Sequence, residues 1–252
     1  MLILLRTLSQ LILLASFSIV QLCPADDGKQ QSIVLAVEDS WPPYSNQKGE
    51  GLSTKILQQA FSSVGINLMT KVYPYARVLA EVEKGILVGG YNVTRQSSTE
   101  EKYLFGKQPL LDATASFYFA NQDATVKNYR DISDIPDGTS IGVIIDYEYG
   151  NTFEQHKHRF KLVAVSQQTQ IINMLQMGRI DGAVLFDAVA IYTLKTMGLE
   201  ANALFKGPLN HTSNIYVAFS KSHSRAQYFA DKLDQGLLKL KKTGEYEKLL
   251  SY

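Results

Sequence analysis

The chain of 252 residues has a single cysteine, a single tryptophan and almost no net charge. One cysteine cannot build a disulfide framework within the chain or a metal site made of several thiolates. Lysine and arginine together number 25 against 24 aspartates and glutamates, which gives a formal net charge of +1. Because nucleic-acid binding needs a strongly basic field, this balance argues against a nucleic-acid partner.

Catalytic and metal-binding motifs are also missing. The sequence has no G-x-S-x-G nucleophile turn, no phosphate-binding loop and no H-E-x-x-H metal motif. His156 and His158 form an H-x-H pair, but no third ligand lies nearby in the sequence, so a solvated loop is the simpler interpretation. We therefore expect no metal, no cofactor and a binding protein rather than an enzyme.

Only one long apolar run is present, at residues 7–23, and several polar residues interrupt it. Residues 23–25 (C-P-A) carry small side chains at the positions that favour signal cleavage after Ala25. A retained membrane anchor is the alternative, but the run is shorter than the roughly 20 apolar residues that span a bilayer. A lipoprotein anchor at Cys23 would need a small residue where Leu22 stands. We predict a cleaved signal peptide over residues 1–25 and a cysteine-free mature chain.

The first half of the mature chain alternates apolar runs with helical periodicity. Residues 33–37 form a continuous apolar run, typical of a strand buried on both faces of a parallel sheet. Residues 52–64 repeat apolar side chains at helical spacing. Residues 66–72, 74–85 and 86–93 are then predicted as strand, helix and strand. This β-α-β-α-β order predicts a right-handed parallel sheet.

A similar order returns in the second half. Residues 139–145 and 160–165 are predicted strands, residues 169–177 a helix, and residues 180–186 another strand. A shared G-x-x-x-G spacing after a helix, at residues 85–89 and 178–182, supports two similar lobes.

Two further predicted strands connect the halves. Residues 115–121 would leave lobe 1 and residues 213–220 would return to it, followed by a helical end at residues 224–250. Two crossings form a hinge, and hinge closure around a ligand is a known switching mode. We predict an α/β fold of two lobes, each a mainly parallel sheet flanked by helices. The predicted domains are lobe 1 at residues 33–118, lobe 2 at residues 122–210 and the return to lobe 1 at residues 214–252.

Three motifs in this order resemble a known family. They are W-P-P-Y at residues 41–44, G-L at residues 51–52 before the first helix, and T-G-E-Y-E-K-L-L at residues 243–250. Together they resemble the bacterial extracellular solute-binding proteins of family 3, the periplasmic receptors of ABC transporters for polar amino acids. The resemblance implies a type II periplasmic-binding-protein fold, a periplasmic monomer and the membrane subunits of an ABC transporter as partners.

The resemblance also implies ligand contacts in lobe 1. An aromatic residue after the first strand stacks on the ligand in the family; Trp41 stands there, with Tyr44 beside it. A threonine and a downstream arginine after the third strand hold the ligand carboxylate. Asn92, Thr94 and Arg95 occupy that region, with the arginine directly after the threonine.

In lobe 2 the family places an acidic residue after the strand that follows G-R-x-D, where it contacts the ligand amine. By spacing, Phe186 occupies the position of this acidic residue, and Asp187 follows it directly. Asp187 is therefore the candidate contact for the ligand amine. A D-Y-E-Y-G loop at residues 146–150 replaces the small Gly/Thr-rich loop common in the family. In an extended segment Tyr147 and Tyr149 would share one face, which could line the cleft or pack on the lobe.

Several candidates have a second interpretation from the residues alone. Trp41 could be a core residue rather than a ligand platform. The planar fork of Arg95 suits a carboxylate, yet a surface arginine is a solvated charge by default. Arg77 could point into the cleft, although an i,i+4 pair with Glu81 is simpler. Glu38 could receive a ligand ammonium or serve as a turn carboxylate.

We therefore predict a periplasmic protein that captures a small polar ligand, an amino acid or a related organic anion, between its lobes for an ABC transporter. Two alternatives remain open. The same fold hosts periplasmic dehydratases of prephenate-like acids, and such chemistry would need a positioned acid or base, such as Glu38 or Asp187. A ligand-sensing module is the other alternative, and it would need a separate partner.

Overall fold

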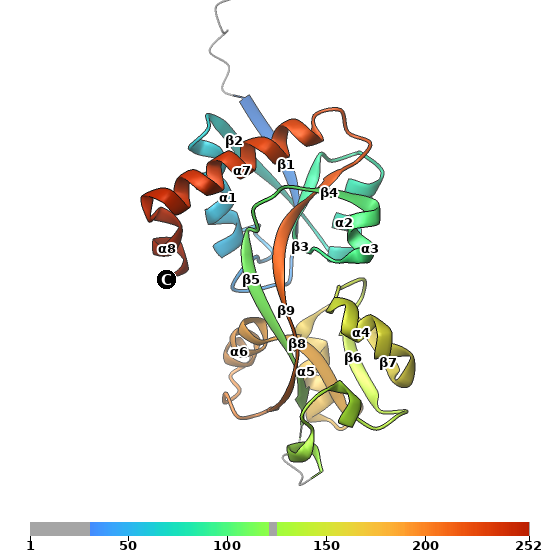
Figure 1. The fold of residues 1–252 in the computed structure, drawn as a ribbon. Coiled ribbons are helices and arrows are strands. Elements are labelled where there is room, and N and C mark those ends of the chain that lie inside the picture. The colour runs from blue at the N-terminus through green and yellow to red at the C-terminus, as the bar shows by residue number, and fades with distance from the viewer. Residues whose placement is uncertain (1–30, 121–124, 252) are drawn as a thin grey trace, which may run out of the picture.

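The computed structural model describes residues 31–120 and 125–251 (Figure 1). The signal peptide predicted over residues 1–25 lies outside the described residues. Within the described ranges, no helix has both the length and the apolar character that a membrane crossing requires.

Strands and helices alternate over most of the described chain, apart from the consecutive strands β4 and β5 and the consecutive helices α7 and α8. The strands are β1 (Gln31–Glu38), β2 (Ile66–Tyr73), β3 (Gly89–Thr94), β4 (Tyr103–Phe105), β5 (Leu111–Phe119), β6 (Ser140–Ile144), β7 (Lys161–Val165), β8 (Gly182–Phe186) and β9 (Phe205–Ser220). The α-helices are α1 (Leu52–Ser62), α2 (Tyr75–Glu83), α3 (Ser97–Lys102), α4 (Gly150–His156), α5 (Gln168–Gln176), α6 (Asp187–Thr196), α7 (Ala226–Thr243) and α8 (Glu245–Leu250). The 3₁₀ turns are η1 (Val126–Asn128), η2 (Ile132–Asp134) and η3 (Lys157–Arg159).

The described strands join in one mixed sheet with the order β2-β1-β3-β9-β5-β8-β6-β7, and β4 pairs with β9. At one end β1 is parallel to both β2 and β3, and at the other end β6 is parallel to both β7 and β8. The antiparallel strands β5 and β9 run through the middle and join the two ends (Figure 1). The predicted α/β fold with mainly parallel strands in each half is confirmed.

We keep the name lobe 1 for β1–β4 with α1–α3, α7 and α8, and the name lobe 2 for β6–β8 with α4–α6 (Figure 1). The strands β5 and β9 are the two crossings between them. The residue limits predicted for the lobes stay a prediction, because β5 and β9 belong to both.

The first strand is buried on both faces, as its continuous apolar run predicts. Leu35 and Val37 pack with Leu57 of α1, while Ala36 packs with Val78 of α2. All five side chains have no measurable exposure. The strand is therefore fixed between two helices, and its carboxyl end has a defined position.

Gly51 explains how the W-P-P-Y turn is held against α1. A Cβ atom at this position would lie 2.2 Å from the carbonyl oxygen of Tyr44, and the φ angle of Gly51 is 146°. Only glycine allows this close approach. The amide of Ser53, in the first turn of α1, donates to the same carbonyl at 3.1 Å. The helix start thereby fixes the turn that carries Trp41.

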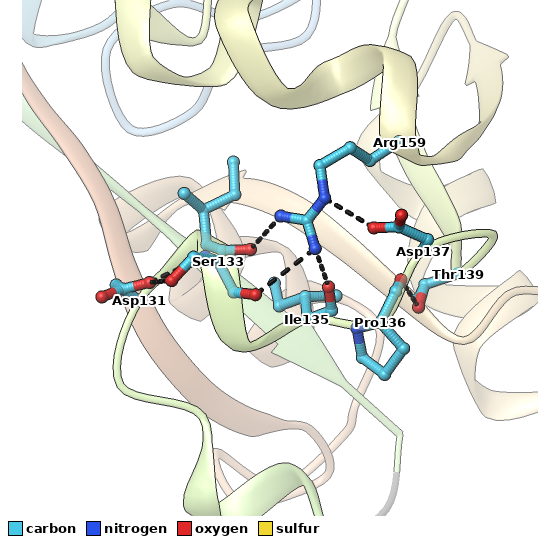
Figure 2. A network of polar contacts seen from close by, with 8 residues as sticks. Asp131, Ser133, Ile135, Pro136, Asp137, Thr139 and Arg159 are labelled. Atoms are coloured by element: carbon cyan, nitrogen blue, oxygen red, sulfur yellow. Dashed lines mark hydrogen bonds and ion pairs between the residues drawn. The ribbon is translucent and has the colours of Figure 1, made fainter.

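Arg159 holds the connection that enters lobe 2 before β6 (Figure 2). Its Nε donates to Asp137 Oδ1 at 2.6 Å, and its terminal nitrogens donate to three backbone carbonyls. The accepting carbonyls belong to Ile132, Ser133 and Ile135, at 3.2, 3.3 and 2.8 Å. One guanidinium thus fixes a whole turn, because its fork presents several donors in a rigid plane.

Candidate functional site

A small cavity lies where the carboxyl ends of β1 and β3 in lobe 1 meet lobe 2. Open α/β sheets place ligands at such strand ends. The lining residues are Glu38, Trp41, Tyr75, Asn92, Thr94, Tyr147, Glu148 and Phe186. The enclosed space is about 10 Å³, which holds about one water molecule. A wider groove of about 470 Å³ opens beside it and shares Tyr147 and Glu148.

Lobe 1 contributes polar groups at the ends of two neighbouring strands. Glu38 is the last residue of β1 and is buried. Asn92 interrupts the pairing of β3 with β9 and has a φ angle of 71°, which is uncommon outside glycine. Its Nδ2 donates to Ser45 Oγ at 3.0 Å. This local backbone distortion turns the Asn92 side chain toward the cavity instead of the sheet face.

Lobe 2 contributes the turn after β6. Asp146 has a φ angle of 61°, so the chain turns sharply before Tyr147 and Glu148. The hydroxyl of Tyr147 donates to Glu38 across the cleft. Tyr75, the first residue of α2, donates its hydroxyl to Glu148 Oε2 at 2.5 Å. Two hydroxyl–carboxyl bonds therefore join the lobes at the cavity.

Burial controls the charge of the two carboxyl groups. It raises the pKa of Glu148 to about 8, although hydrogen bonds from Tyr75 and from the backbone of Thr94 oppose the increase. Burial also raises the pKa of Glu38 well above its ordinary value, against the hydrogen bond from Tyr147. The nearby Glu148 adds to that increase. Burial thus favours the protonated form of both carboxyl groups, and hydrogen bonds keep them in place.

Aromatic rings form the remaining walls. The buried Trp41 packs on Tyr44 with a centroid distance of 4.2 Å and meets the edge of Phe186 at 5.1 Å. Tyr75 and Tyr147 make an edge-to-face contact at 4.8 Å. Rings of both lobes therefore meet around the cavity, with large contact areas that would separate if the lobes moved apart.

No protein-family model matches the chain, and no curated protein matches its sequence. Many solved structures match it in fold. A histidine kinase sensor domain with similarity to periplasmic binding proteins has a TM-score of 0.75 and 15% identity, over 88% of this chain and 96% of that one. An ancestral arginine-binding protein bound to arginine has a TM-score of 0.72 and 17% identity, over 87% and 96%. The chain has a periplasmic-binding-protein fold.

A third structure with this fold is an amino acid ABC transporter substrate-binding protein from Streptococcus pneumoniae, bound to L-arginine. Its TM-score is 0.70 at 17% identity, and the match covers 87% of this chain and 93% of that chain. Amino-acid-binding proteins of ABC transporters are thus among the structural neighbours, in agreement with the resemblance found in the sequence.

Within this periplasmic-binding-protein fold, five of the predicted site residues line the cavity together. They are Glu38, Trp41, Asn92, Thr94 and Tyr147. Tyr44 lies behind Trp41 and supports its ring. Whether these residues contact a ligand stays a prediction, but their convergence from both lobes is a property of the fold.

Arg95 lies away from this cavity. Its Nε pairs with Glu100 Oε1 at 2.6 Å, and its guanidinium carbon lies 5.7 and 5.4 Å from the ring centroids of Phe105 and Tyr216. The side chain is 39% exposed and lines a separate open groove beside Ser213. The cause is local, since the side chain of Thr94 enters the cavity and the next residue of the chain turns outward. Its role as a carboxylate clamp stays a prediction.

Arg77 and Asp187 also lie outside the cavity lining. The side chain of Arg77 is 61% exposed and lies 3.4 Å from Glu81, the i,i+4 pair that the helix spacing allows. Asp187 begins α6, where it accepts bonds from the hydroxyl of Tyr118 at 2.9 Å and from Lys206 Nζ at 2.7 Å. Both side chains pair with groups outside the cavity lining.

Sequence reasoning missed Tyr75, Glu148 and Phe186 as site residues. An extended D-Y-E-Y-G segment would place Glu148 opposite the two tyrosines, but the turn at Asp146 brings Glu148 and Tyr147 to the same cavity. Phe186, which lines the cavity, immediately precedes Asp187, the residue that was predicted to contact the ligand. Tyr75 follows a proline at a helix start, which gave no sign of which way its ring faces.

Proposed function

We propose that the chain is a solute-binding protein that captures a small polar ligand between its two lobes and closes over it. One observation carries this proposal. Side chains of lobe 2, Tyr147 and Glu148, bond to Glu38 and Tyr75 of lobe 1 around one enclosed cavity. These groups of the two lobes meet only when the lobes are together. They are therefore suited to hold a ligand in the closed form but not in the open form.

The crossings β5 and β9 supply the hinge in this proposal. Their pairing shifts register twice, between Ala115 and Ser116 and again between Ser116 and Tyr118. Such irregularities let a strand pair bend. A ligand shifts an open–closed equilibrium only through its different affinity for the two states. Contacts made by both lobes would supply that difference, since an open cleft keeps only the contacts of lobe 1.

We further propose that the mature chain is a periplasmic monomer that delivers its ligand to the membrane subunits of an ABC transporter. The predicted signal peptide and the transporter-type structural neighbours support this proposal. A sensor role is the second candidate, because a histidine kinase sensor domain shares the fold. Ligand uptake by cells lacking the gene separates the two, since it falls for a transport component and is unchanged for a sensor.

We do not extend the proposal to dehydration of prephenate-like acids. In the described part of the chain, no lysine, arginine or histidine side chain lines the cavity. Two carboxylates of such a substrate would meet Glu38 and Glu148 with no opposite charge beside them, and burying unpaired charges is costly.

Thermal unfolding in the presence of amino acids, organic acids and amines tests the proposal. At a concentration 100 times the Kd, a ligand that binds only the folded chain adds about 2.7 kcal/mol. For a chain of this size that corresponds to an increase in Tm of roughly 5–10 °C. We expect at least one compound to give such an increase. If none of the three classes changes Tm, the chain is not a receptor for small polar solutes.

A further inference from the structure

The charge of the cavity differs from that of a carboxylate-binding site. Its two ionisable acidic side chains, Glu38 and Glu148, come from opposite lobes and are both buried. Two basic side chains, Lys102 and Lys157, line the outer groove and pair with Glu83 at 4.0 Å and Glu154 at 2.5 Å. Within the described residues, the enclosed lining therefore offers acidic groups and no fixed positive charge.

Two polar atoms of the lining also lack a partner. Trp41 Nε1 and Asn92 Oδ1 are buried, and neither has a hydrogen bond in the structure. Trp41 and Asn92 are 1% and 4% exposed. Because buried polar groups are nearly always paired in proteins, an unpaired donor and an unpaired acceptor in one cavity point to a ligand that supplies both partners.

We infer that the ligand of this cavity is a small organic amine that binds as a cation and needs no carboxylate group. This inference rests on the proposed solute-binding function and names its ligand class. In the bound form the ammonium group lies between Glu38 and Glu148 and takes the places of the hydroxyl groups of Tyr147 and Tyr75, while the rest of the ligand extends into the wider groove that shares Tyr147 and Glu148. An N–H of the amine donates to Asn92 Oδ1, and a neutral acceptor on the ligand receives the Trp41 N–H.

The aromatic walls suit the same class of ligand. Faces of tryptophan and tyrosine rings attract organic cations, and the attraction is strongest where water is excluded. Trp41, Tyr75 and Tyr147 all line the cavity beside the two carboxyl groups. An anionic ligand would meet the negative faces of these rings as well as the acidic side chains.

Binding of a cation here also moves protons. Burial favours the protonated forms of Glu38 and Glu148, and their cavity neighbours Tyr75 and Tyr147 donate hydroxyl hydrogens to them. An ammonium ion beside these groups favours their ionised forms. The protons are released to solvent, so the heat of binding depends on the buffer.

Calorimetric titration of the purified secreted protein with matched pairs of compounds tests the inference. The pairs are cadaverine with L-lysine, agmatine with L-arginine, and ethanolamine with L-serine, which differ only in the α-carboxylate. We expect at least one amine to bind ten-fold or more tightly than its parent amino acid. We also expect its apparent enthalpy to differ between phosphate and Tris buffers at pH 7.5, as proton release requires.

Substitutions of Glu38 and Glu148 test whether these two carboxyl groups bind the amine. Glu38→Gln keeps the shape and the acceptor for Tyr147 but removes the negative charge, and should weaken binding of the amine about ten-fold. Glu148→Gln should do the same from lobe 2, and it keeps the test valid if the first variant does not fold. Glu50→Gln removes the same charge from an exposed position of lobe 1 and should leave affinity unchanged.

The outcomes separate the inference from the proposed function. Equal or tighter binding of the amino acids overturns the inference and leaves the solute-binding function intact. The inference is also overturned, and the solute-binding function again left intact, if the Glu38→Gln and Glu148→Gln variants both bind an amine with the affinity of the wild type. If organic acids also fail to bind alongside the amines and amino acids, the proposed function fails together with the inference.

Discussion

Replacing Glu148 with glutamine should flatten the dependence of protein stability on pH. Glu148 is 8% exposed, and burial raises its pKa from the ordinary 4.5 to about 8. Between these two pH values the folded chain holds a proton that the unfolded chain releases. The contribution of this group is therefore fully present below pH 4.5 and is lost as the pH rises through about 8. Glutamine carries no titrating proton and removes this contribution.

The size of the effect follows from the width of that interval. Each pH unit corresponds to about 1.4 kcal/mol, so the full loss is at most about 5 kcal/mol. Opening of the lobes would expose Glu148 and limit the loss to the free energy of opening. We expect wild-type stability to fall by roughly 2–3 kcal/mol between pH 5 and pH 8. The variant should lose about half as much, since Glu38 titrates in the same direction.

Urea unfolding at pH 5, 6, 7 and 8 measures this directly. The single tryptophan, Trp41, lines the cavity, so its emission reports the region that changes. Glu50→Gln is the control, because its side chain is exposed and its pH dependence should match that of the wild type. If Glu148→Gln shows the same slope of stability against pH as the wild type, burial of Glu148 does not govern the pH response.

Other variants test separate parts of the structure. Trp41→Ala should destabilise the fold by about 3–5 kcal/mol in urea unfolding, because it empties a fully buried aromatic position, and a loss below 1 kcal/mol would contradict the packing described. Arg159→Lys should lower stability by about 1–3 kcal/mol, since lysine cannot reach Asp137 and three carbonyls together. The Arg159→Lys variant should keep the ligand affinity of the wild type. Arg95→Ala should change ligand affinity less than about three-fold, because its side chain lies off the cavity, whereas a hundred-fold loss in calorimetry would restore it as a carboxylate clamp.

The order of strands and helices could be predicted wherever burial leaves a simple pattern. The apolar run at residues 33–37 lies within β1, and the predicted helix at residues 169–177 matches α5 within one residue. The helix α6 was not predicted. It begins immediately after β8 without a loop, and its exposed Ile191 and Tyr192 break the expected division into apolar and polar faces.

The site could be predicted in lobe 1 better than in lobe 2. Glu38 follows from the strand pattern and Thr94 from the family resemblance, and both line the cavity. In lobe 2 the decisive feature is the positive φ angle of Asp146, which side-chain periodicity cannot reveal. Arg95 lies outside the cavity and pairs with Glu100, five residues later, and no spacing rule predicted this pairing.

Small-angle X-ray scattering tests the central claim most directly. The claim is that two lobes joined by β5 and β9 close over a ligand at Glu38, Trp41 and Tyr147. Scattering should be recorded at pH 7.5 with and without a saturating compound that raises Tm. The account predicts a smaller radius of gyration with the compound, and the same decrease in the Glu38→Gln variant only at about ten times the concentration. A bound wild-type protein whose radius of gyration does not change would contradict closure of the lobes.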